Sequence, residues 1–153
     1  MPVPVTLQVF FVLLSGAVLG SRRGAWSQLQ YLALGAAGLP VFSGGQSGLT
    51  AFAGPTTGYL LGFVAMAWVV GRLTERAARP SWLRAFVAML AGIAALYLPG
   101  TAWLSLWLHF TGMAGSDALS RAFLLGVTPF FAVDLVKAAL AAGLATRLCR
   151  RSA

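Results

Sequence analysis

Charge is what this 153-residue chain has least of: only 9% of its residues are charged, and only three are acidic. A soluble domain carries roughly 25% charged residues. With 59% hydrophobic residues and a mean hydropathy of +0.83, the chain has more apolar surface than a soluble fold can bury. The composition therefore predicts an integral membrane protein in contact with a lipid bilayer.

Residue types that support catalysis or metal binding are also scarce. The single cysteine, Cys149, excludes an internal disulfide, and the single histidine, His109, has no second histidine or cysteine at metal-ligand spacing. The GxxxxGK[ST] motif of nucleotide-binding loops is absent, so the chain is not expected to hydrolyse ATP itself. No Ser–His–Asp set or carboxylate pair within one segment supports an enzyme. The sequence therefore predicts neither catalysis nor a bound cofactor.

The uncharged runs are long enough for several membrane crossings. They cover 1–21, 24–71 and 85–116. Because a helical span needs about 20 residues, these runs hold four spans, and the segment after Gly126 adds a fifth. The runs are continuously apolar rather than alternating, which favours helices over a β-barrel. We predict an all-α bundle of five transmembrane helices that forms a single membrane domain, 1–153.

Glycine, proline and basic residues bound the predicted spans, which cover approximately residues 5–20, 25–41, 55–73, 85–97 and 128–146. The fourth span is expected to end or bend at Pro99 and Gly100, and at most to reach Leu108. A glycine-rich connection, 42–54, joins the second and third spans. The segment 72–84 is predicted to be a water-exposed loop, and 109–125 a loop with a short helix.

Basic residues give the predicted topology. Nine of the eleven follow the first, third and fifth spans, and such residues concentrate on the cytoplasmic side. The C-terminus is therefore expected in the cytoplasm and the N-terminus outside. An uncharged outer N-terminus without a preceding helix is an unusual start, so we expect a leading helix to be missing from this sequence. Because the basic residues lie between spans, the formal charge of +8 does not indicate nucleic-acid binding.

One acid–base pair lies inside an apolar segment. The run VTPFFAVDLVKAAL, residues 127–140, contains Asp134 and Lys137, whose spacing places both on one face of a helix. Ionisable groups inside a bilayer are costly and generally functional. A carboxylate accepts hydrogen bonds and an ammonium donates them, so the pair can recognise a ligand with both donors and acceptors. The alternative is an ion pair that locks the helix to a neighbour.

Uncharged polar and aromatic residues near the outer ends of the predicted spans are candidates for the other walls of a site. Tyr59 offers a ring face and a hydroxyl. Thr56, Thr6 and Gln8 offer hydrogen bonds, and Phe42 lies at the same predicted level. Further aromatic residues at that level are Phe63, Trp103 and Trp107. Each aromatic residue has an alternative function in helix packing or in the interfacial belt.

Four motifs, in order, resemble one transporter family. GPTTGYLLGF, residues 54–63, resembles the GPTGGYLxGF signature of BioY, the biotin-specific substrate-binding (S) component of energy-coupling-factor (ECF) transporters. Residues 127–140 resemble its second hallmark, a Pro-Phe followed by an Asp-x-x-Lys pair. PVPVTLQVFFVLLSGAVLG and RRGAWSQLQYLALGAAGLPVF follow the family pattern too, so the resemblance covers nearly the whole chain. Thr57 departs from the usual glycine.

The resemblance implies the role of each site residue. Asp134 would accept hydrogen bonds from the ureido N–H groups of biotin, and Lys137 would donate to either the ureido oxygen or the carboxylate. Tyr59 and neighbouring aromatic residues would cover the bicycle, and the connection 42–54 would form a lid. As part of the family signature, Gly58 joins the candidate site residues.

The resemblance also implies partners and a location. An ECF transmembrane (T) component and ATP-binding cassette ATPases would energise biotin uptake, and the chain would lie as a multi-pass protein in the bacterial inner or plasma membrane. BioY proteins resemble six-helix bundles with a helix before PVPVTLQ. We expect that the gene start was assigned too late and that this accounts for its absence here; a five-span protein is the alternative. Two other functions stay open: a stand-alone biotin transporter that needs no ATPase, and an S component for another vitamin.

Overall fold

The computed structural model describes residues 6–75, 81–113 and 117–151, and within them every regular element is helical. The elements are α1 (Gln8–Ala36), the short turns η1 (Ser43–Gly45) and η2 (Leu49–Ala53), α2 (Thr57–Thr74), α3 (Trp82–Phe110), α4 (Ala118–Gly126) and α5 (Thr128–Arg151). Three stretches of these described residues are long and apolar enough to cross a membrane: Thr57–Thr74, Trp82–Phe110 and Ala118–Cys149. The predicted all-α class is confirmed, whereas this count does not confirm five spans.

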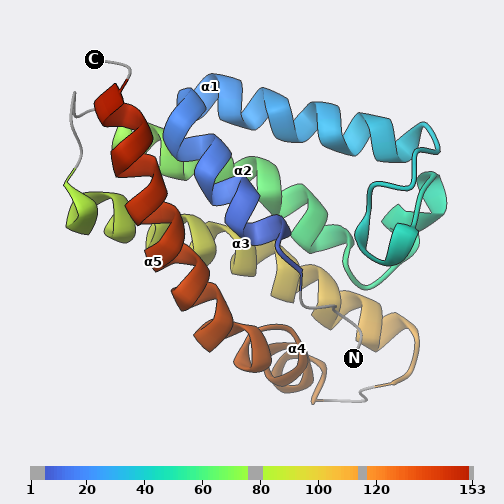
Figure 1. Cartoon of the computed structure of the whole chain (residues 1–153). Helices are drawn as coiled ribbons and strands as arrows, with labels where there is room; N and C mark the ends of the chain where they lie inside the picture. The colour runs from blue at the N-terminus through green and yellow to red at the C-terminus, as the bar shows by residue number, and fades with distance from the viewer. Residues whose placement is uncertain (1–5, 76–80, 114–116, 152–153) are drawn as a thin grey trace.

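Helix α1 is broken in the middle and folds back on itself (Figure 1). Gly20 has φ 81° and ψ 177°, a conformation that glycine adopts without the steric penalty of a Cβ atom. The break separates two arms, 8–19 and 21–36, which correspond to the first two predicted spans. Each arm is shorter than the about 20 residues of a full span.

The two arms of α1 lie in close contact. A Cβ atom added to Gly24 would lie only 3.0 Å from Cα of Gly16, so these glycines let the backbones approach. Further from the break, Gln28 Nε2 donates to Ser15 Oγ at 3.1 Å, and the buried Gln28 is thereby satisfied inside an apolar region. The break and these contacts make α1 an antiparallel hairpin.

The turn of this hairpin rests on the end of α2. Gly71 faces the backbone of Ser21 so closely that an added Cβ atom would overlap it. Beyond Gly71, the Glu75 carboxylate accepts hydrogen bonds from the Ser21 N–H and the Ser21 hydroxyl, both at 2.9 Å. It therefore supplies, from another helix, the cap that the start of the second arm needs. These bonds, with Arg72 nearby, hold the pKa of the Glu75 carboxyl below its ordinary value.

Helix α3 differs from the prediction at both ends. It begins at Trp82, where the Ser81 hydroxyl caps it by accepting from the N–H of Arg84 at 3.3 Å. It then continues through Pro99 to Phe110, so the alternative of a helix end at Pro99 is wrong, whereas the further predicted limit, Leu108, lies close to the observed end. A proline removes one backbone hydrogen bond, and packing against neighbouring helices makes this loss tolerable in membrane helices. Of the predicted loop 72–84, residues 76–80 lie outside the described part.

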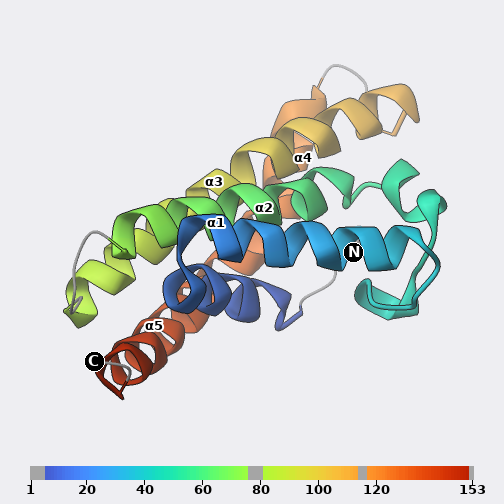
Figure 2. The same cartoon turned by 90° about the horizontal axis from the view of Figure 1, so that it is seen from above.

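Helices α2 and α5 each pack against both α1 and α3. In both views the turn of α1, the end of α2, the start of α3 and the end of α5 share one end of the bundle (Figures 1 and 2). The connection between α1 and α2, the end of α3 and α4 share the other. Arg22 and Arg23 belong to the turn of α1, Arg72 to the end of α2, Arg84 to the start of α3 and Arg147 to the end of α5. The described members of the three basic groups therefore belong to elements that share one end of the fold, as the sequence predicts.

We expect Glu75→Gln to destabilise the protein at neutral pH, because the amide cannot replace a carboxylate that accepts from both Ser21 donors. Since the pKa of Glu75 is lowered in the folded state, its contribution is present above the unfolded value of about 4.3 and is lost as the pH falls through the folded value. Thermal unfolding midpoints should therefore differ most at pH 7 and converge in acid. The control Arg72→Gln removes only an exposed pair and should change the midpoint little. If the thermal unfolding midpoints of Glu75→Gln and wild type differ by the same amount at all pH values, this assignment is contradicted.

Candidate functional site

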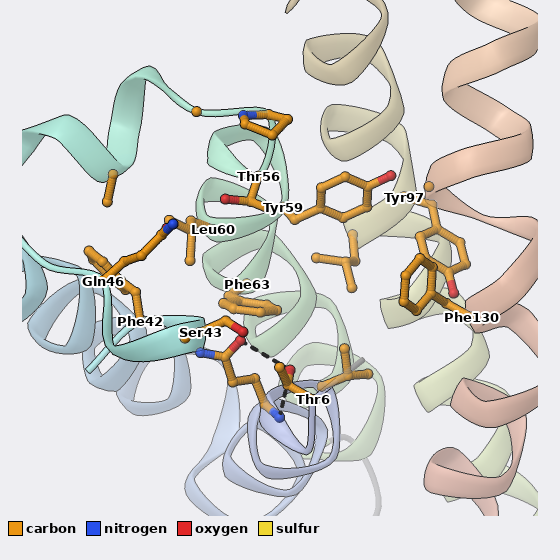
Figure 3. Close-up of a pocket in the computed structure, with 18 of the residues that line it drawn as sticks. Thr6, Phe42, Ser43, Gln46, Thr56, Tyr59, Leu60, Phe63, Tyr97 and Phe130 are labelled. Atoms are coloured by element: carbon orange, nitrogen blue, oxygen red, sulfur yellow. Dashed lines mark hydrogen bonds between the residues drawn. The ribbon is translucent and has the colours of Figure 1, made fainter. Parts of the chain in front are cut away.

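A cavity of about 670 Å³ lies between α1, α2, α3, α5 and the connection 37–56. This volume is typical of small-molecule sites. Figure 3 shows Gln46 and Ser43 of the connection on one side, Tyr97 and Phe130 on the other, and Phe63 between them. The polar side chains in its wall are Thr6, Gln8, Ser43, Gln46, Ser47, Thr50, Thr56, Tyr59, Tyr97, Asp134 and Lys137.

Asp134 and Lys137 are the charged residues among those that line the cavity. They are 2% and 7% exposed, and Lys137 Nζ donates to Asp134 Oδ1 at 2.8 Å. Both project from one face of α5, whose neighbouring alanines Ala138 and Ala141 are fully buried. Because small side chains let α5 approach the other helices, the pair is enclosed rather than exposed to lipid. Burial of two ions is costly, and mutual pairing offsets part of that cost.

Tyr97, which the sequence analysis did not single out, completes the environment of Asp134. Its hydroxyl donates to Asp134 Oδ2 at 2.7 Å from the facing helix α3. Each carboxylate oxygen thus holds one donor, and each keeps a further acceptor position. The sequence offered one signal for Tyr97: an aromatic residue with a hydroxyl inside an otherwise apolar run. That signal alone does not distinguish a ligand-binding residue from one that packs between helices.

Tyr59 lines the cavity from α2 and reaches toward α3 and the end of α4. It is 7% exposed, and its ring lies against Gly100, where an added Cβ atom would come within 2.5 Å of ring carbons. Its hydroxyl lies against Gly126 and has no hydrogen-bond partner among the residues that the structure describes. Such an unpaired buried hydroxyl costs free energy, so it is available to a ligand atom or a water molecule.

The connection between α1 and α2 covers the cavity and is held at both ends. At the first end, the Tyr31 hydroxyl donates to the carbonyl of Val41 at 3.0 Å, and Gln8 Nε2 donates to that hydroxyl. The Phe42 ring packs against Gly35 and lies edge-on to Tyr31, with ring centroids 5.5 Å apart. These contacts tie the first residues of the connection to both arms of α1.

At the second end, two indole groups of α3 hold the connection. Trp103 Nε1 donates to the carbonyl of Gly54 at 2.9 Å, and Trp107 Nε1 to that of Ala53 at 3.2 Å. The hydroxyl of Thr57 donates to the carbonyl of Phe52 at 2.7 Å, so this departure from the family glycine serves the connection rather than the cavity. Between the two ends, Gly44, Gly45 and Gly48 have positive φ. The polar residues of this part that line the cavity are Ser43, Gln46, Ser47 and Thr50.

The cavity brings together seven of the eight candidate site residues: Asp134, Lys137, Tyr59, Thr56, Thr6, Gln8 and Phe42. Gly58 is placed elsewhere, at the contact of α2 with α3, where an added Cβ atom would overlap the Pro99 carbonyl and the Trp103 side chain. Trp103 also does not line the cavity, because its indole reaches the connection instead. Spacing along the sequence does not predict which of these groups faces inward.

We expect removal of either charge from the buried pair to destabilise the protein. Asp134→Asn or Lys137→Met leaves its partner unpaired, at a cost of roughly 3–5 kcal/mol. The double variant leaves no unpaired charge and should recover most of the loss. Thermal unfolding of the two single variants and the double variant measures this coupling. Additive losses in the double variant contradict a coupled buried pair.

Comparison with known proteins places the chain in a family. A family model described as the BioY family matches residues 1–153. The chain is 42% identical over 147 residues to a probable biotin transporter BioY of Pyrococcus horikoshii, covering 96% of this chain and 81% of that protein. It is 40% identical to the biotin transporter BioY of Thermotoga maritima, with the same two coverages.

A solved structure shares the fold. The crystal structure of the S-component for biotin from an ECF-type ABC transporter superposes with a TM-score of 0.81 at 26% identity, over 98% of this chain and 77% of that chain. These relatives are named as transporters rather than enzymes. The helices long and apolar enough for spans agree with that assignment. The chain is therefore a multi-pass membrane protein, not an enzyme, and it belongs to the BioY family.

Proposed function

We propose that this chain is the high-affinity biotin-binding component of an ECF vitamin uptake system and captures biotin from the outer side of the membrane. The observation that carries the proposal is the buried Asp134–Lys137 pair in the wall of a cavity of about 670 Å³. Relatives named as biotin transporters support the choice of ligand.

The ureido group of biotin fits the charged pair chemically. In a cyclic urea each N–H lies beside the carbonyl on one edge, so that edge offers a donor and an acceptor together. Asp134 accepts from the N–H, and Lys137 donates to the carbonyl oxygen, with the two groups 2.8 Å apart. We assign the ureido end rather than the carboxylate end to this pair, because a ligand carboxylate beside Asp134 would be repelled.

The rest of the cavity accommodates the remainder of biotin. Phe63, Leu60 and Phe130 provide apolar walls for the thioether ring, and Tyr59 adds a ring face with an unpaired hydroxyl. The acyl chain then extends to the connection, where Ser43 and its polar neighbours donate hydrogen bonds to the carboxylate. The connection acts as a lid whose two ends stay attached to α1 and α3.

The proposed orientation in the membrane follows from charge. We assign to the cytoplasm the end of the bundle formed by the turn of α1 and the ends of α2 and α5, elements that carry Arg22, Arg72 and Arg147, together with the C-terminus. The cavity and its lid then face outward. In this arrangement the two arms of α1 are the first two of five membrane crossings, in the inner or plasma membrane of a bacterial cell.

The energy for uptake is assigned to partners. The chain has no nucleotide-binding loop motif, and its structural neighbour is named as the S-component of an ECF-type ABC transporter. We therefore propose an ECF T component and ATP-binding cassette ATPases as partners. A stand-alone carrier would need no such proteins.

Asp134→Asn or Lys137→Ala is expected to weaken biotin binding by about 100-fold or more, because each leaves a charge unpaired in an apolar site. The matched control is Asp117→Asn, the same acid-to-amide change at a residue outside the cavity wall. Calorimetry of purified protein with biotin, thiamin and riboflavin measures affinity and ligand choice together. Unchanged biotin affinity in either cavity variant refutes the site, and preference for another vitamin refutes the ligand.

Uptake is expected to depend on the partners. Cells that express this chain but lack every T component and ECF ATPase should bind labelled biotin without accumulating it. Adding the partners should restore accumulation above the external concentration. Biotin accumulation without them would instead establish a stand-alone transporter.

A further inference from the structure

We infer that Tyr97 is a positioning residue for ligand recognition: its hydroxyl fixes the orientation in which Asp134 presents its carboxylate to the cavity. This inference rests on the proposed recognition of a ureido group by Asp134. It starts from the 2.7 Å hydrogen bond that Tyr97 donates to Asp134 Oδ2, while Lys137 holds Oδ1.

Lys137 alone does not set the plane of the Asp134 carboxylate. The terminal torsion of aspartate is broad and nearly two-fold, so the group can rotate while one oxygen keeps its contact with Lys137. In addition, Lys137 is on the same helix, three residues away, on a flexible stem. A second donor from a different helix holds the other oxygen and thereby defines the plane. The remaining acceptor positions then point in a fixed direction, which preorganised recognition requires.

Tyr97 is well placed to be the fixed partner. Its neighbours on α3, Leu96 and Gly100, are buried, and both face α2 at close range. A Cβ atom on Gly62 would come within 3.0 Å of Leu96, and one on Gly100 within 2.5 Å of the Tyr59 ring. The packing of α2 on α3 therefore sets the level of Tyr97, while α5 sets the level of Asp134.

Two other functions of the Tyr97 hydroxyl have less support. A simple tie between helices is partly redundant, because Trp82 Nε1 already reaches the Ala139 carbonyl of α5 from α3, at 3.4 Å. Donation to the ligand is excluded while the single O–H hydrogen of Tyr97 is used by Asp134. The hydroxyl therefore acts on the ligand through Asp134.

The test compares wild type, Tyr97→Phe and the control Thr101→Val by calorimetry with biotin and with desthiobiotin, which keeps the ureido group but lacks the thioether ring. Thr101 lies one turn further along α3, where its hydroxyl bonds the Tyr97 carbonyl of its own helix. Tyr97→Phe should weaken both ligands by the same factor, about 10- to 100-fold, since it removes a hydrogen bond to a charged group. Thr101→Val should stay within about threefold.

Each other outcome is decisive. Wild-type affinity in Tyr97→Phe overturns the inference and leaves the proposed function intact. Loss for biotin but not for desthiobiotin assigns Tyr97 to the thioether ring and also overturns it. Equal losses in Tyr97→Phe and Thr101→Val indicate a general disturbance of α3, with the same consequence. If wild type binds neither ligand, the proposed function fails and the inference fails with it.

Unfolding of the ligand-free variants checks that the comparison is made on folded protein. Tyr97→Met, whose flexible apolar side chain fills the same space, is the second variant if Tyr97→Phe does not purify folded. It should lose affinity for both ligands by a similar factor. Retained affinity in folded Tyr97→Met overturns the inference equally.

Discussion

The hydrogen-bonded ion pair of Asp134 and Lys137 is the constraint on which the rest of this structure depends. Enclosing two ions in an apolar bundle costs several kcal/mol for each ion, and pairing recovers that cost only when geometry and further hydrogen bonds are good. The 2.8 Å contact and the hydroxyl of Tyr97 meet this requirement. The pair is thus stable without a ligand yet keeps acceptor and donor capacity toward the cavity.

Close approach of the helix backbones creates the space around this pair. Gly100 and Gly126 make room for Tyr59. The Gly16–Gly24 contact lets α1 return along itself, so that its first arm lines the cavity and its second arm anchors the lid through Tyr31. The small residues therefore matter because of where they lie: they leave room for large aromatic side chains, which in turn shape the cavity.

The sequence predicted the charged pair, the shared face of α5 and the common end of the basic residues, because helical spacing and membrane charge rules depend on local order. Its alternative of a helix end at Pro99 was wrong, since tolerance of a proline depends on packing from other helices. Tyr97 was not predicted for the same reason: only the crossing of α3 and α5 brings it to Asp134. The polar side chains of Ser43, Gln46, Ser47 and Thr50, which line the cavity, were not predicted as site residues either. Gly58 belongs to the motif of the cavity wall but packs on α3.

The most direct test of the proposed recognition is an experimental structure of the protein with biotin bound. The ureido ring is expected between Asp134 and Lys137, with the carboxylate at Ser43 and its polar neighbours in the lid. A biotin carboxylate on Lys137, or biotin bound outside this cavity, would contradict the proposed recognition of the ureido group by the buried pair.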